Sequence, residues 1–512
     1  MRFFCLNSQS CNELPSGWTI TNLGSIIRKI SNGITHKQTK TNNGIPVTRI
    51  ETISNGIIDL ERVGYLPEIS NDLIEKYKLE SGDILFSNIN SDFHLGKTAI
   101  FTLDTLLLHG MNLLLLRPNQ EIIVSKFFNY LCNWFRLSGQ FISIAQHAVN
   151  QSSINQTKLS GLQIPVPPLN EQKRIVSKLE ELLTKLDAGI EYLKETQILL
   201  KQYRQSILKY AFEGKLTEKW RKENPHVIQH LSNLFDNIYQ LKDVKKKEHL
   251  KILYNNLIQI PNEWKWTTIG DITLSMKNGI YKPPNFYNEK GIACLRMYNI
   301  EEGNIIWKDI KRMNLTKNEV KDYELNPGDI LVNRVNSREL VGKAATIPHG
   351  LETCIYESKN IRLRISNKFI NSKLVSFWFL LYGQRYFNNN AQQTVGMASI
   401  NQVQLGAMPI PLMSIEEQEL LIREIERRFS IISHNIENIK IYLNFSKNLY
   451  QSILKVAFEG KLVLQDPADE PVEILLERIK REIKLTIPIK KGKSKIAKKK
   501  SIDNDSKQMR LM

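Results

Sequence analysis

Cysteine is scarce in this sequence, and no two cysteines are close enough to form a C-x-x-C pair. The low count disfavours a disulfide framework and a zinc site, and it predicts reduced thiols in a cytoplasmic protein. Long apolar runs are absent too, because no stretch of about 18 apolar residues occurs, which excludes a membrane-spanning helix. The apolar run at the N-terminus is too short for a signal peptide. The five cysteines are Cys5, Cys11, Cys132, Cys294 and Cys354.

Motifs that carry catalysis are also missing. There is no G-x-x-x-x-G-K-[ST] phosphate loop and no G-x-G-x-x-G after a predicted strand. His226 and His230 are four residues apart, but they lack the glutamate of an H-E-x-x-H metal site. No activated nucleophile stands out, and no residue is predicted to bind a cofactor. The sequence therefore indicates a binding protein and not an enzyme.

Acidic residues are too few to balance the basic ones. The chain has 70 Lys and Arg against 52 Asp and Glu, a net charge of +18. This balance favours a polyanionic partner such as nucleic acid, although a lysine-rich solvated surface is the alternative. Seven lysines lie between Lys490 and Lys500, which predicts a basic tail without fixed structure. Such a tail contacts phosphates nonspecifically or is simply solvated.

One long stretch of the sequence occurs twice. "SILKYAFEGKL" (Ser206–Leu216) and "SILKVAFEGKL" (Ser452–Leu462) differ at one letter, and 452 minus 206 gives a shift of 246 residues. The same shift relates "LESGDILFSNINS" to "LNPGDILVNRVNS", "SSINQTKL" to "ASINQVQL", and "IPVPPLNEQ" to "IPLMSIEEQ". A period this long indicates a duplicated domain and not a solenoid.

Each copy begins with a part that mixes strands and one helix. In the first copy, "GIPVTRIE", "GDILFSNI", "KTAIF" and "MNLLLLRP" are short β-rich runs separated by Gly, Asn and Asp. A helix follows, because apolar residues recur at helical spacing, and this stripe is interpreted as core packing. The stripe contains Val124, Phe128, Leu131 and Phe135, with Ile370, Leu374, Phe377 and Leu381 in the second copy.

Each copy then continues into a long helix. No proline occurs from Glu171 to Phe212, and apolar residues recur every seven positions, which predicts a coiled-coil seam. A helix of this length cannot bury its seam alone, so its duplicate is the expected partner. Gly214 and Gly460 are predicted helix caps; a surface shared with a partner protein is the alternative reading of the repeated ending. The predicted seam is Leu179, Leu183, Leu186, Ile190, Leu193, Leu200, Ile207, Ile425, Phe429, Ile432, Ile436, Ile439, Leu443 and Ile453.

The order of these motifs, duplicated at a fixed shift, closely resembles the specificity subunit of type I restriction–modification systems. "LPSGW" and "IPNEW" open the two copies, "GDIL" with a later "GK" lies in the middle of each, and "SINQ" precedes each long helix. The resemblance covers residues from about 12 to 465 and implies an α+β fold. It implies two target recognition domains separated by two antiparallel coiled-coil helices with a pseudo-two-fold. The expected divisions are a recognition domain at 1–168, a spacer helix at 169–214, a connector at 215–256, a second recognition domain at 257–414, a second helix at 415–460 and a basic tail at 461–512.

The same resemblance implies a function. Each recognition domain is expected to read one half of a bipartite, asymmetric site in double-stranded DNA, while the helices set the spacer. Two methyltransferase subunits that use S-adenosylmethionine are expected to dock on the helices, and restriction subunits that use ATP and Mg²⁺ are expected to join them. The chain itself would be non-catalytic and would bind no cofactor. A recognition subunit of a related fused system and a protein-binding coiled-coil scaffold are the alternatives.

Candidate DNA contacts follow from side-chain chemistry. Base edges are read by Arg, Lys, Asn, Gln, Ser and Thr, and phosphates are bound by Lys and Arg. Each candidate has a plain alternative as a solvated loop residue or a helix-capping residue. The candidates in the first copy are Lys37, Lys40, Asn88, Asn90, Lys97, Gln151, Ser152 and Ser153, and those in the second copy are Lys282, Arg334, Asn336, Arg338, Lys343, Gln393 and Thr394.

Overall fold

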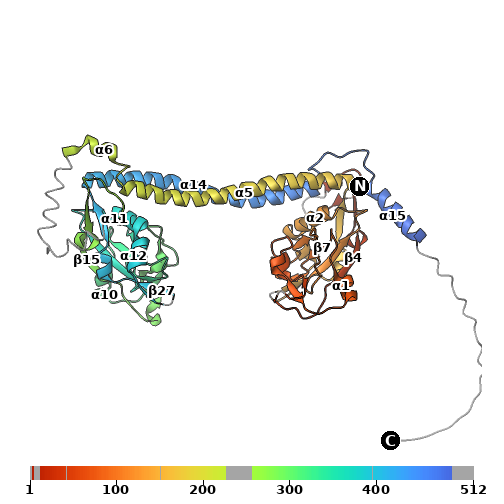
Figure 1. Cartoon of the computed structure of the whole chain (residues 1–512), viewed down its shortest axis with the longest axis horizontal. Coiled ribbons are helices and arrows are strands. Elements are labelled where there is room, and N and C mark those ends of the chain that lie inside the picture. Colours follow the sequence, from red (N-terminus) through yellow and green to blue (C-terminus); the bar gives the residue numbers. More distant parts are fainter. Residues whose placement is uncertain are drawn as a thin grey trace, which may run out of the picture. The chain divides into compact units, whose positions relative to one another are not determined.

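The computed structural model describes residues 3–4, 12–41, 43–149, 151–226, 257–394 and 396–486. The chain divides into two compact units. Unit 1 contains Met1–Ile190 and Leu443–Met512, and unit 2 contains Glu191–Tyr442. Each unit therefore combines the mixed domain of one copy with the end of the long helix of the other copy (Figure 1).

The mixed domain of unit 1 is built on an antiparallel sheet of four strands in the order β4-β10-β7-β9. The predicted β-rich runs form strands here, and β10 is buried because it lies inside the sheet with apolar residues on both faces. The strands of unit 1 are β1 (Phe3–Phe4), β2 (Asn12–Glu13), β3 (Thr19–Asn22), β4 (Ile27–Asn32), β5 (Ile45–Val47), β6 (Gly64–Leu66), β7 (Ile84–Phe86), β8 (Ile89–Asn90), β9 (Thr98–Ile100), β10 (Leu114–Pro118), β11 (Gln146–Ala148), β12 (Gln151–Ser153) and β13 (Gln163–Val166).

The mixed domain of unit 2 repeats this sheet in the order β15-β25-β21-β23. It adds a second sheet, β16-β20-β17-β24, where unit 1 has only the pair β5-β6. The strands are β14 (Lys265–Thr268), β15 (Thr273–Asn278), β16 (Tyr287–Asn288), β17 (Ile292–Leu295), β18 (Ile300–Glu301), β19 (Asn304–Ile305), β20 (Lys311–Met313), β21 (Ile330–Asn333), β22 (Val335–Asn336), β23 (Ala344–Thr346), β24 (Cys354–Tyr356), β25 (Asn360–Ile365), β26 (Gln392–Thr394), β27 (Met397–Ser399) and β28 (Pro409–Leu412).

The predicted core stripe lies on one helix in unit 1 and on two helical segments in unit 2. Phe128, Leu131 and Phe135 are buried on α2 (Ser125–Leu137). In unit 2, α11 (Ser372–Trp378) passes into the π-helix η6 (Phe379–Gly383). The wider turn was not predicted, because the apolar spacing of the two copies is alike. The other short helices are α1 (Asn71–Tyr77), α3 (Gln140–Ile144), α4 (Gln156–Ser160), α6 (Glu218–Glu223), α9 (Ile269–Ile272), α10 (Lys317–Tyr323), α12 (Gln384–Asn390) and α13 (Gln402–Gly406), with 3₁₀ turns at Leu23–Ser25, Ile50–Ile53, Leu60–Arg62, Pro284–Phe286 and Met297–Asn299.

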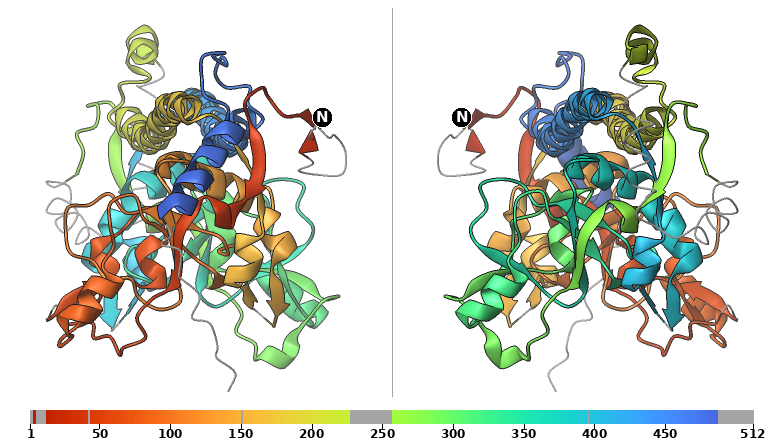
Figure 2. Two further views of the ribbon diagram at one scale, coloured as in Figure 1. Left: turned by 90° about the vertical axis from the view of Figure 1, so that its right-hand side faces the viewer. Right: turned by 90° about the vertical axis from the view of Figure 1, so that its left-hand side faces the viewer.

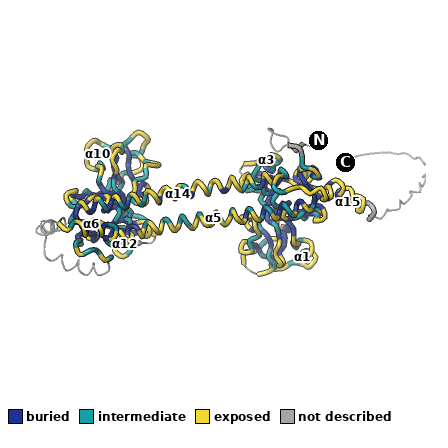
Figure 3. The backbone as a smooth tube through the Cα atoms, turned by 90° about the horizontal axis from the view of Figure 1, so that it is seen from above, coloured by how far each residue is buried: buried dark blue, intermediate teal, exposed yellow. Residues whose placement is uncertain are grey.

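Two long helices of 44 residues each, α5 (Leu169–Phe212) and α14 (Ile415–Phe458), begin in one unit and end in the other. Within each unit they run antiparallel, since the start of one lies beside the end of the other: Leu179 shares a core with Leu454 in unit 1, and Ile425 shares one with Leu208 in unit 2. All fourteen predicted seam residues are buried or half-buried, while exposed turns alternate with half-buried ones along both helices (Figure 3).

The repeated helix ending closes the domain of the other copy. The ring of Phe458, at the end of α14, lies 5.4 Å from both Phe127 and Trp134 of unit 1, measured between centroids. In unit 2, the ring of Phe212 lies 4.9 Å from Trp378 in the same way. Both phenylalanines are fully buried. The repeated segment therefore includes one ring, here called the plug, that is buried in the mixed domain of the other copy against different aromatic residues in the two units.

Glycine is required two residues after each plug. Gly214 and Gly460 have φ of 71° and 69°, the left-handed conformation that ends a helix. A Cβ added at Gly214 would lie 2.2 Å from Pro261, and one added at Gly460 would lie 2.3 Å from Pro15. The predicted cap is therefore also a point of close packing against the start of a mixed domain.

A buried Glu-Gln pair fixes the beginning of each long helix. The indole N–H of Trp18 donates to Glu171 at 3.0 Å, and that of Trp264 donates to Glu417 at 2.9 Å. The next residue, Gln172 or Gln418, accepts from the backbone N–H before the domain helix and donates to two carbonyls. Burial raises the pKa of the Glu171 carboxyl, although the Trp18 hydrogen bond opposes the shift.

The segment after each long helix folds back onto this buried glutamate. In unit 2, Arg221 forms an ion pair with Glu417, and Thr217 donates to the same carboxylate at 2.6 Å. In unit 1, Arg174 pairs with Asp469 at 2.7 Å beside Glu171, and hydrogen bonding to Arg174 lowers the pKa of Asp469. The two copies thus use different charges for the same junction.

The C-terminal segment differs from the predicted tail at 461–512. Helix α15 (Val472–Thr486) follows the second long helix (Figure 2, left). It buries Val472, Leu475 and Ile479 in the core of unit 1, and the Val472 N–H donates to Gly17 O at 3.1 Å. Its apolar residues recur at i, i+3 and i+7, a helical pattern that the strong lysine signal further on obscured. The lysines at 490–500, Cys5, Cys11, His230 and most of the predicted connector lie outside the described residues.

None of the helices in the described ranges combines the length and the apolar character of a membrane span. The same ranges contain no group of three or more His, Cys, Asp or Glu side chains that could hold a metal ion. Cys132, Cys294 and Cys354 are free and buried, and burial raises the pKa of the Cys354 thiol to about 11.

The buried plugs predict a strong effect of truncation. We expect Phe458→Ala to lower the free energy of unfolding of unit 1 by about 3–5 kcal/mol, because the ring leaves a cavity among aromatic side chains. Phe212→Ala should do the same in unit 2. Urea unfolding followed by tryptophan fluorescence measures the effect. The neighbouring exposed residues Val456 and Tyr210 serve as matched controls, and losses in Val456→Ala or Tyr210→Ala as large as those of the plug variants would contradict the assignment.

Candidate nucleic-acid interface

Two segments of unit 1 that were predicted to contact DNA form one small sheet. Strands β11, β12 and β8 pair in that order, although β8 lies far from the others in sequence. Ser152 on β12 is the cross-strand partner of both Asn90 on β8 and His147 on β11. Gln151 is exposed, Ser152 is buried and Ser153 is half-buried, the alternation of a strand with one covered face.

Unit 2 builds the same sheet from the equivalent segments, in the order β22-β27-β26. Asn336 is opposite Ala398, and Gln393 is opposite Ala398 on the other side. The backbones of Gln393 and Thr394 belong to β26, but their side chains lie outside the described part of the structure. In each unit, therefore, the structure brings the two predicted segments together in one small sheet.

Two of the predicted amides hold a turn in the same way in both copies. The amide of Asn90 donates to Ser87 Oγ at 3.2 Å and accepts from the Ser91 N–H at 2.9 Å. Asn336 donates to Asn333 at 2.8 Å and accepts from the Ser337 N–H at 2.9 Å. Because these contacts are duplicated, Asn90 and Asn336 shape the turn and do not distinguish the two domains.

Asn88 and Arg334 occupy equivalent positions and brace the neighbouring loop. The Asn88 amide donates to Ile154 O at 3.4 Å. The Arg334 guanidinium donates to Ile400 O and to Ser358 O, each at 3.4 Å. Both side chains are half-buried, so their first task is to hold the "INQ" segment against the sheet.

Lys97 is half-buried, whereas a lysine that binds phosphate on a protein surface is exposed. Its ammonium group donates to Ser54 O at 2.8 Å. Burial lowers the pKa of Lys97, and the nearby Arg136 lowers it further. Lys343, at the equivalent position of unit 2, is half-buried. Both lysines directly precede a strand of the main sheet, β9 or β23.

The three loop lysines differ in their surroundings. Lys37 and Lys40 are exposed in the loop between β4 and β5. Lys282 is already paired, since its ammonium group lies 2.6 Å from Glu319 and 4.5 Å from the centre of the Phe286 ring. Lys282 is therefore the weakest of the three as a phosphate contact.

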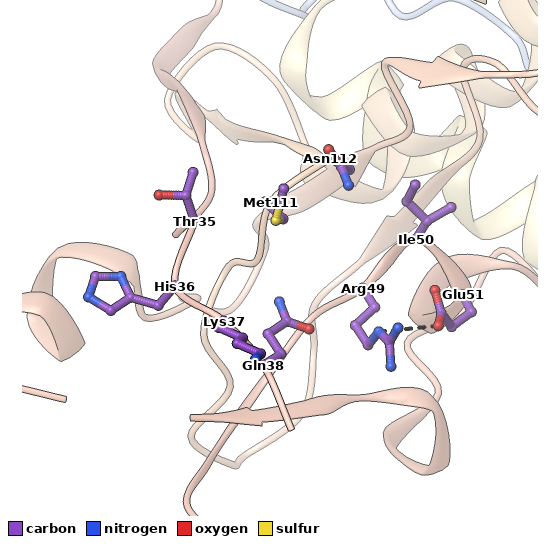
Figure 4. Close-up of a pocket in the computed structure, with 9 residues that line it drawn as sticks. All are labelled: Thr35, His36, Lys37, Gln38, Arg49, Ile50, Glu51, Met111 and Asn112. Carbon is purple, nitrogen blue, oxygen red and sulfur yellow. Dashed lines mark ion pairs between the residues drawn. The ribbon is translucent and has the colours of Figure 1, made fainter. Parts of the chain in front are cut away.

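Lys37 also borders a cavity of about 250 Å³ in unit 1 (Figure 4). Two amides, Gln38 and Asn112, line it, and Arg49 pairs with Glu51 at 3.2 Å along its wall. Asn112 has a φ of 67°, the left-handed conformation of a tight turn. The remaining lining residues are Thr35, His36, Ile50 and Met111.

Sequence reasoning missed a polar cluster beside the sheet of β11, β12 and β8, here called the β8 sheet; its counterpart in unit 2 is the β22 sheet. The hydroxyl of Ser152 donates to the Asp92 carboxylate, and His147 Nδ1 lies 2.8 Å from Ser152 Oγ. His147 and Asp92 themselves are 3.4 Å apart. Asp92 is not among the predicted contacts. A signal was present, since the equivalent residue in the second copy is the predicted contact Arg338, which is exposed.

A second duplicated surface lies on the long helices. Large apolar side chains are exposed at matching positions, with Leu199 at 54% and its mate Phe445 at 60%. In unit 1, a groove of about 290 Å³ lies between α2 and α14, and its lining includes Ser452 and Lys455 of the repeated segment. Two further exposed pairs follow along the helices: Tyr203 with Leu449, and Tyr210 with Val456.

Comparison with known protein families gives a match to the type I restriction modification DNA specificity domain over residues 15–198. The chain is 33% identical over 423 residues to a putative type I restriction enzyme MjaX specificity subunit of Methanocaldococcus jannaschii, covering 81% of this chain and 87% of that protein. It is 27% identical over 491 residues to the type I restriction enzyme EcoKI specificity subunit of Escherichia coli, covering 92% and 97%.

Solved structures with the same fold are more distant in sequence. A chain from a study of complex assembly and conformational transition of the type I R-M system aligns with a TM-score of 0.61 at 18% identity, covering 88% of this chain and all of that chain. The HsdS subunit from Thermoanaerobacter tengcongensis aligns with a TM-score of 0.50 at 17% identity, covering 88% and 98%.

Proposed function

Because the chain belongs to the specificity subunits of type I restriction–modification systems, we propose that it is the non-catalytic, DNA-reading subunit of such a complex. Each mixed domain reads one half of a bipartite, asymmetric site in double-stranded DNA. The long helices set the distance between the half-sites and dock the methyltransferase subunits. Restriction subunits complete the complex.

One observation supports the proposal that the two domains recognise different half-sites. The β8 sheet and the β22 sheet have the same backbone arrangement, but the side chains at equivalent positions differ. Asn88 corresponds to Arg334, Asp92 to Arg338, and Ser152 to Ala398. A shared framework with different hydrogen-bonding groups is what two readers of unequal sequences need, since base edges are distinguished by donor and acceptor pattern.

The repeated helix ending supports two copies of one partner. Leu208, Ala211 and Phe212 are buried, and packing explains why they recur as Leu454, Ala457 and Phe458. Ser206, Lys209 and Lys215 are exposed, yet they recur as Ser452, Lys455 and Lys461. Packing does not require that second match. An exposed surface repeated beside exposed apolar side chains fits a docking site used twice, once for each methyltransferase subunit.

The chemistry is assigned to the partners. The described residues include no group of three or more His, Cys, Asp or Glu side chains that could hold a metal ion, and Cys132, Cys294 and Cys354 are buried. S-adenosylmethionine is proposed for the methyltransferase subunits, and ATP and Mg²⁺ for the restriction subunits. The proposed role of this chain is to position adenine in the correct sequence for its partners.

Exchange of one domain tests this function. Residues 15–168 are replaced by the corresponding domain of a relative that keeps the aromatic socket for Phe458, and modified adenines are mapped by sequencing after modification in the reconstituted complex. We expect one half of the methylated site to change while the other half stays the same. Exchange of residues 261–414 is the matched control and should change only the other half. Unchanged methylation in both exchanges would favour a protein-binding scaffold.

Lengthening both helices tests the spacer. Gln197 is seven residues before Arg204, and Lys440 is seven residues after Ser433; since Arg204 donates to Ser433 at 2.7 Å, these two positions face each other. Insertion of one heptad after each keeps the seam in register and adds about 10 Å. We expect a spacer longer by about three base pairs, at about 3.4 Å each. An unaltered spacer would contradict the role, and a four-residue insertion in α5 alone, which breaks the seam register, should abolish modification.

Lys37 and Lys282 provide a matched pair for phosphate binding. Lys37 is exposed, whereas Lys282 is neutralised by Glu319. We expect Lys37→Gln to reduce the slope of log affinity against log salt by about 1, because one fewer counterion is released, and Lys282→Gln to leave the slope unchanged. Binding of the reconstituted complex to its site between low and moderate salt gives both slopes. Equal slopes for the two variants would show that Lys37 does not contact a phosphate.

A further inference from the structure

The cluster of His147, Ser152 and Asp92 is a chain of hydrogen bonds that ends on a carboxylate. Ser152 has one hydroxyl hydrogen, and it is donated to Asp92. Ser152 Oγ can therefore only accept from His147 Nδ1, which lies 2.8 Å away, so this nitrogen carries the hydrogen. The direction of donation runs from His147 through Ser152 to Asp92 Oδ1.

This arrangement fixes the carboxylate but leaves part of it free. Ser152 is only 2% exposed, whereas the Asp92 side chain is 63% exposed. Oδ1 receives the Ser152 hydrogen bond, and His147 Nδ1 is 3.4 Å from the same oxygen. The second oxygen remains open to an external donor.

Asp92 lies in the turn directly after β8, next to the residues expected to face DNA. A carboxylate there is unfavourable beside phosphates unless a base supplies a hydrogen-bond donor. In the major groove, cytosine offers its N4 amine, and adenine offers its N6 amine next to the N7 acceptor. An acceptor-only group is repelled by N7, so cytosine is the better partner.

The second copy replaces every member of this cluster. Asp92 corresponds to Arg338, Ser152 to Ala398 and His147 to Gln393. Arg338 is exposed in the equivalent turn after β22. Arginine pairs with the O6 and N7 acceptors of guanine, which is the opposite of what a carboxylate selects.

We propose that Asp92, positioned by Ser152 and His147, selects cytosine at one position of the half-site read by unit 1, and that Arg338 selects guanine at the equivalent position of the half-site read by unit 2. This inference rests on the proposed function, because it requires that the two domains read DNA. It names the residues that make the two half-sites differ. Asp92 and Arg338 are the contact residues, and Ser152 and His147 position the carboxylate.

The test uses the full chain in a complex with its methyltransferase and a library of DNA sites, with modified adenines mapped by sequencing. We expect Asp92→Asn to reduce the preference for cytosine at one position of one half-site by roughly 5- to 100-fold, because an amide both donates and accepts. The triple variant Asp92→Arg, Ser152→Ala and His147→Gln copies the second domain and should shift that position towards guanine. The other half-site should not change.

Positioning by Ser152 has its own readout. Ser152→Ala should weaken the base preference while modification continues, and Ser152→Thr, which keeps the hydroxyl, should restore it. Asp104→Asn is the matched control. Asp104 is an exposed carboxylate that follows β9, whereas Asp92 precedes this strand. If Asp92→Asn abolishes all modification, Arg338→Ala provides the test of the inference. This variant should weaken the base preference at one position of the other half-site.

An unchanged recognition sequence in the Asp92 and Arg338 variants would overturn the inference and leave the proposed function standing. A wild-type complex without a bipartite methylated sequence would overturn the proposed function itself. A relaxed position in the wrong half-site would also overturn the inference, since each residue is assigned to one unit.

Discussion

The burial of Phe458 in unit 1 and of Phe212 in unit 2 is the interaction on which the rest of the structure depends. Each ring belongs to one copy and completes the aromatic core of the other. The glycine after each ring then allows the chain to pass within contact of a proline at the start of the neighbouring domain. The long helices are therefore anchored at both ends by buried groups, with a Glu-Gln pair at the beginning and a phenylalanine at the end.

This anchoring separates framework from recognition. The tryptophan–glutamate bond, the glutamine that caps the domain helix and the asparagine that shapes the β8 or β22 turn are the same in both copies. Many of the differences lie at exposed positions, such as Asp92 and Arg338 in the turns and Lys37 in a loop, and unit 2 has an additional sheet. A duplicated framework can thus carry two unlike surfaces, because these exposed side chains do not belong to either core.

Much of the fold was predictable from periodicity. The shift of 246 residues identified the duplication, and the heptads identified helices whose seam residues are all covered. Periodicity could not identify the π-helix at Phe379–Gly383, since Leu374 and Phe377 follow the same spacing as a regular helix. It also missed α15, because the lysines beyond it dominated the composition. The end of each long helix packs in the mixed domain of the other copy. This arrangement depends on tertiary packing, which no local pattern encodes.

The candidate interface was predictable only as a set of segments. The residues before "INQ" and after "GDIL" do meet in one sheet in each unit. Their separate tasks could not be read from residue type, since Asn90 holds a turn, Lys97 is bound to a backbone carbonyl and Lys282 is paired with Glu319. Asp92 was overlooked because its two neighbours in space, Ser152 and His147, are more than fifty residues away in the chain.

The division of the chain also has a consequence for its biosynthesis. Unit 2 is a continuous stretch, so all of it is translated before the last part of unit 1. The first domain must keep its socket of Phe127 and Trp134 open until Phe458 and α15 emerge. At about 5–20 residues per second this delay lasts roughly 15–60 seconds. The part of the protein that is made first is therefore finished last, and its buried aromatic residues stay uncovered during this delay.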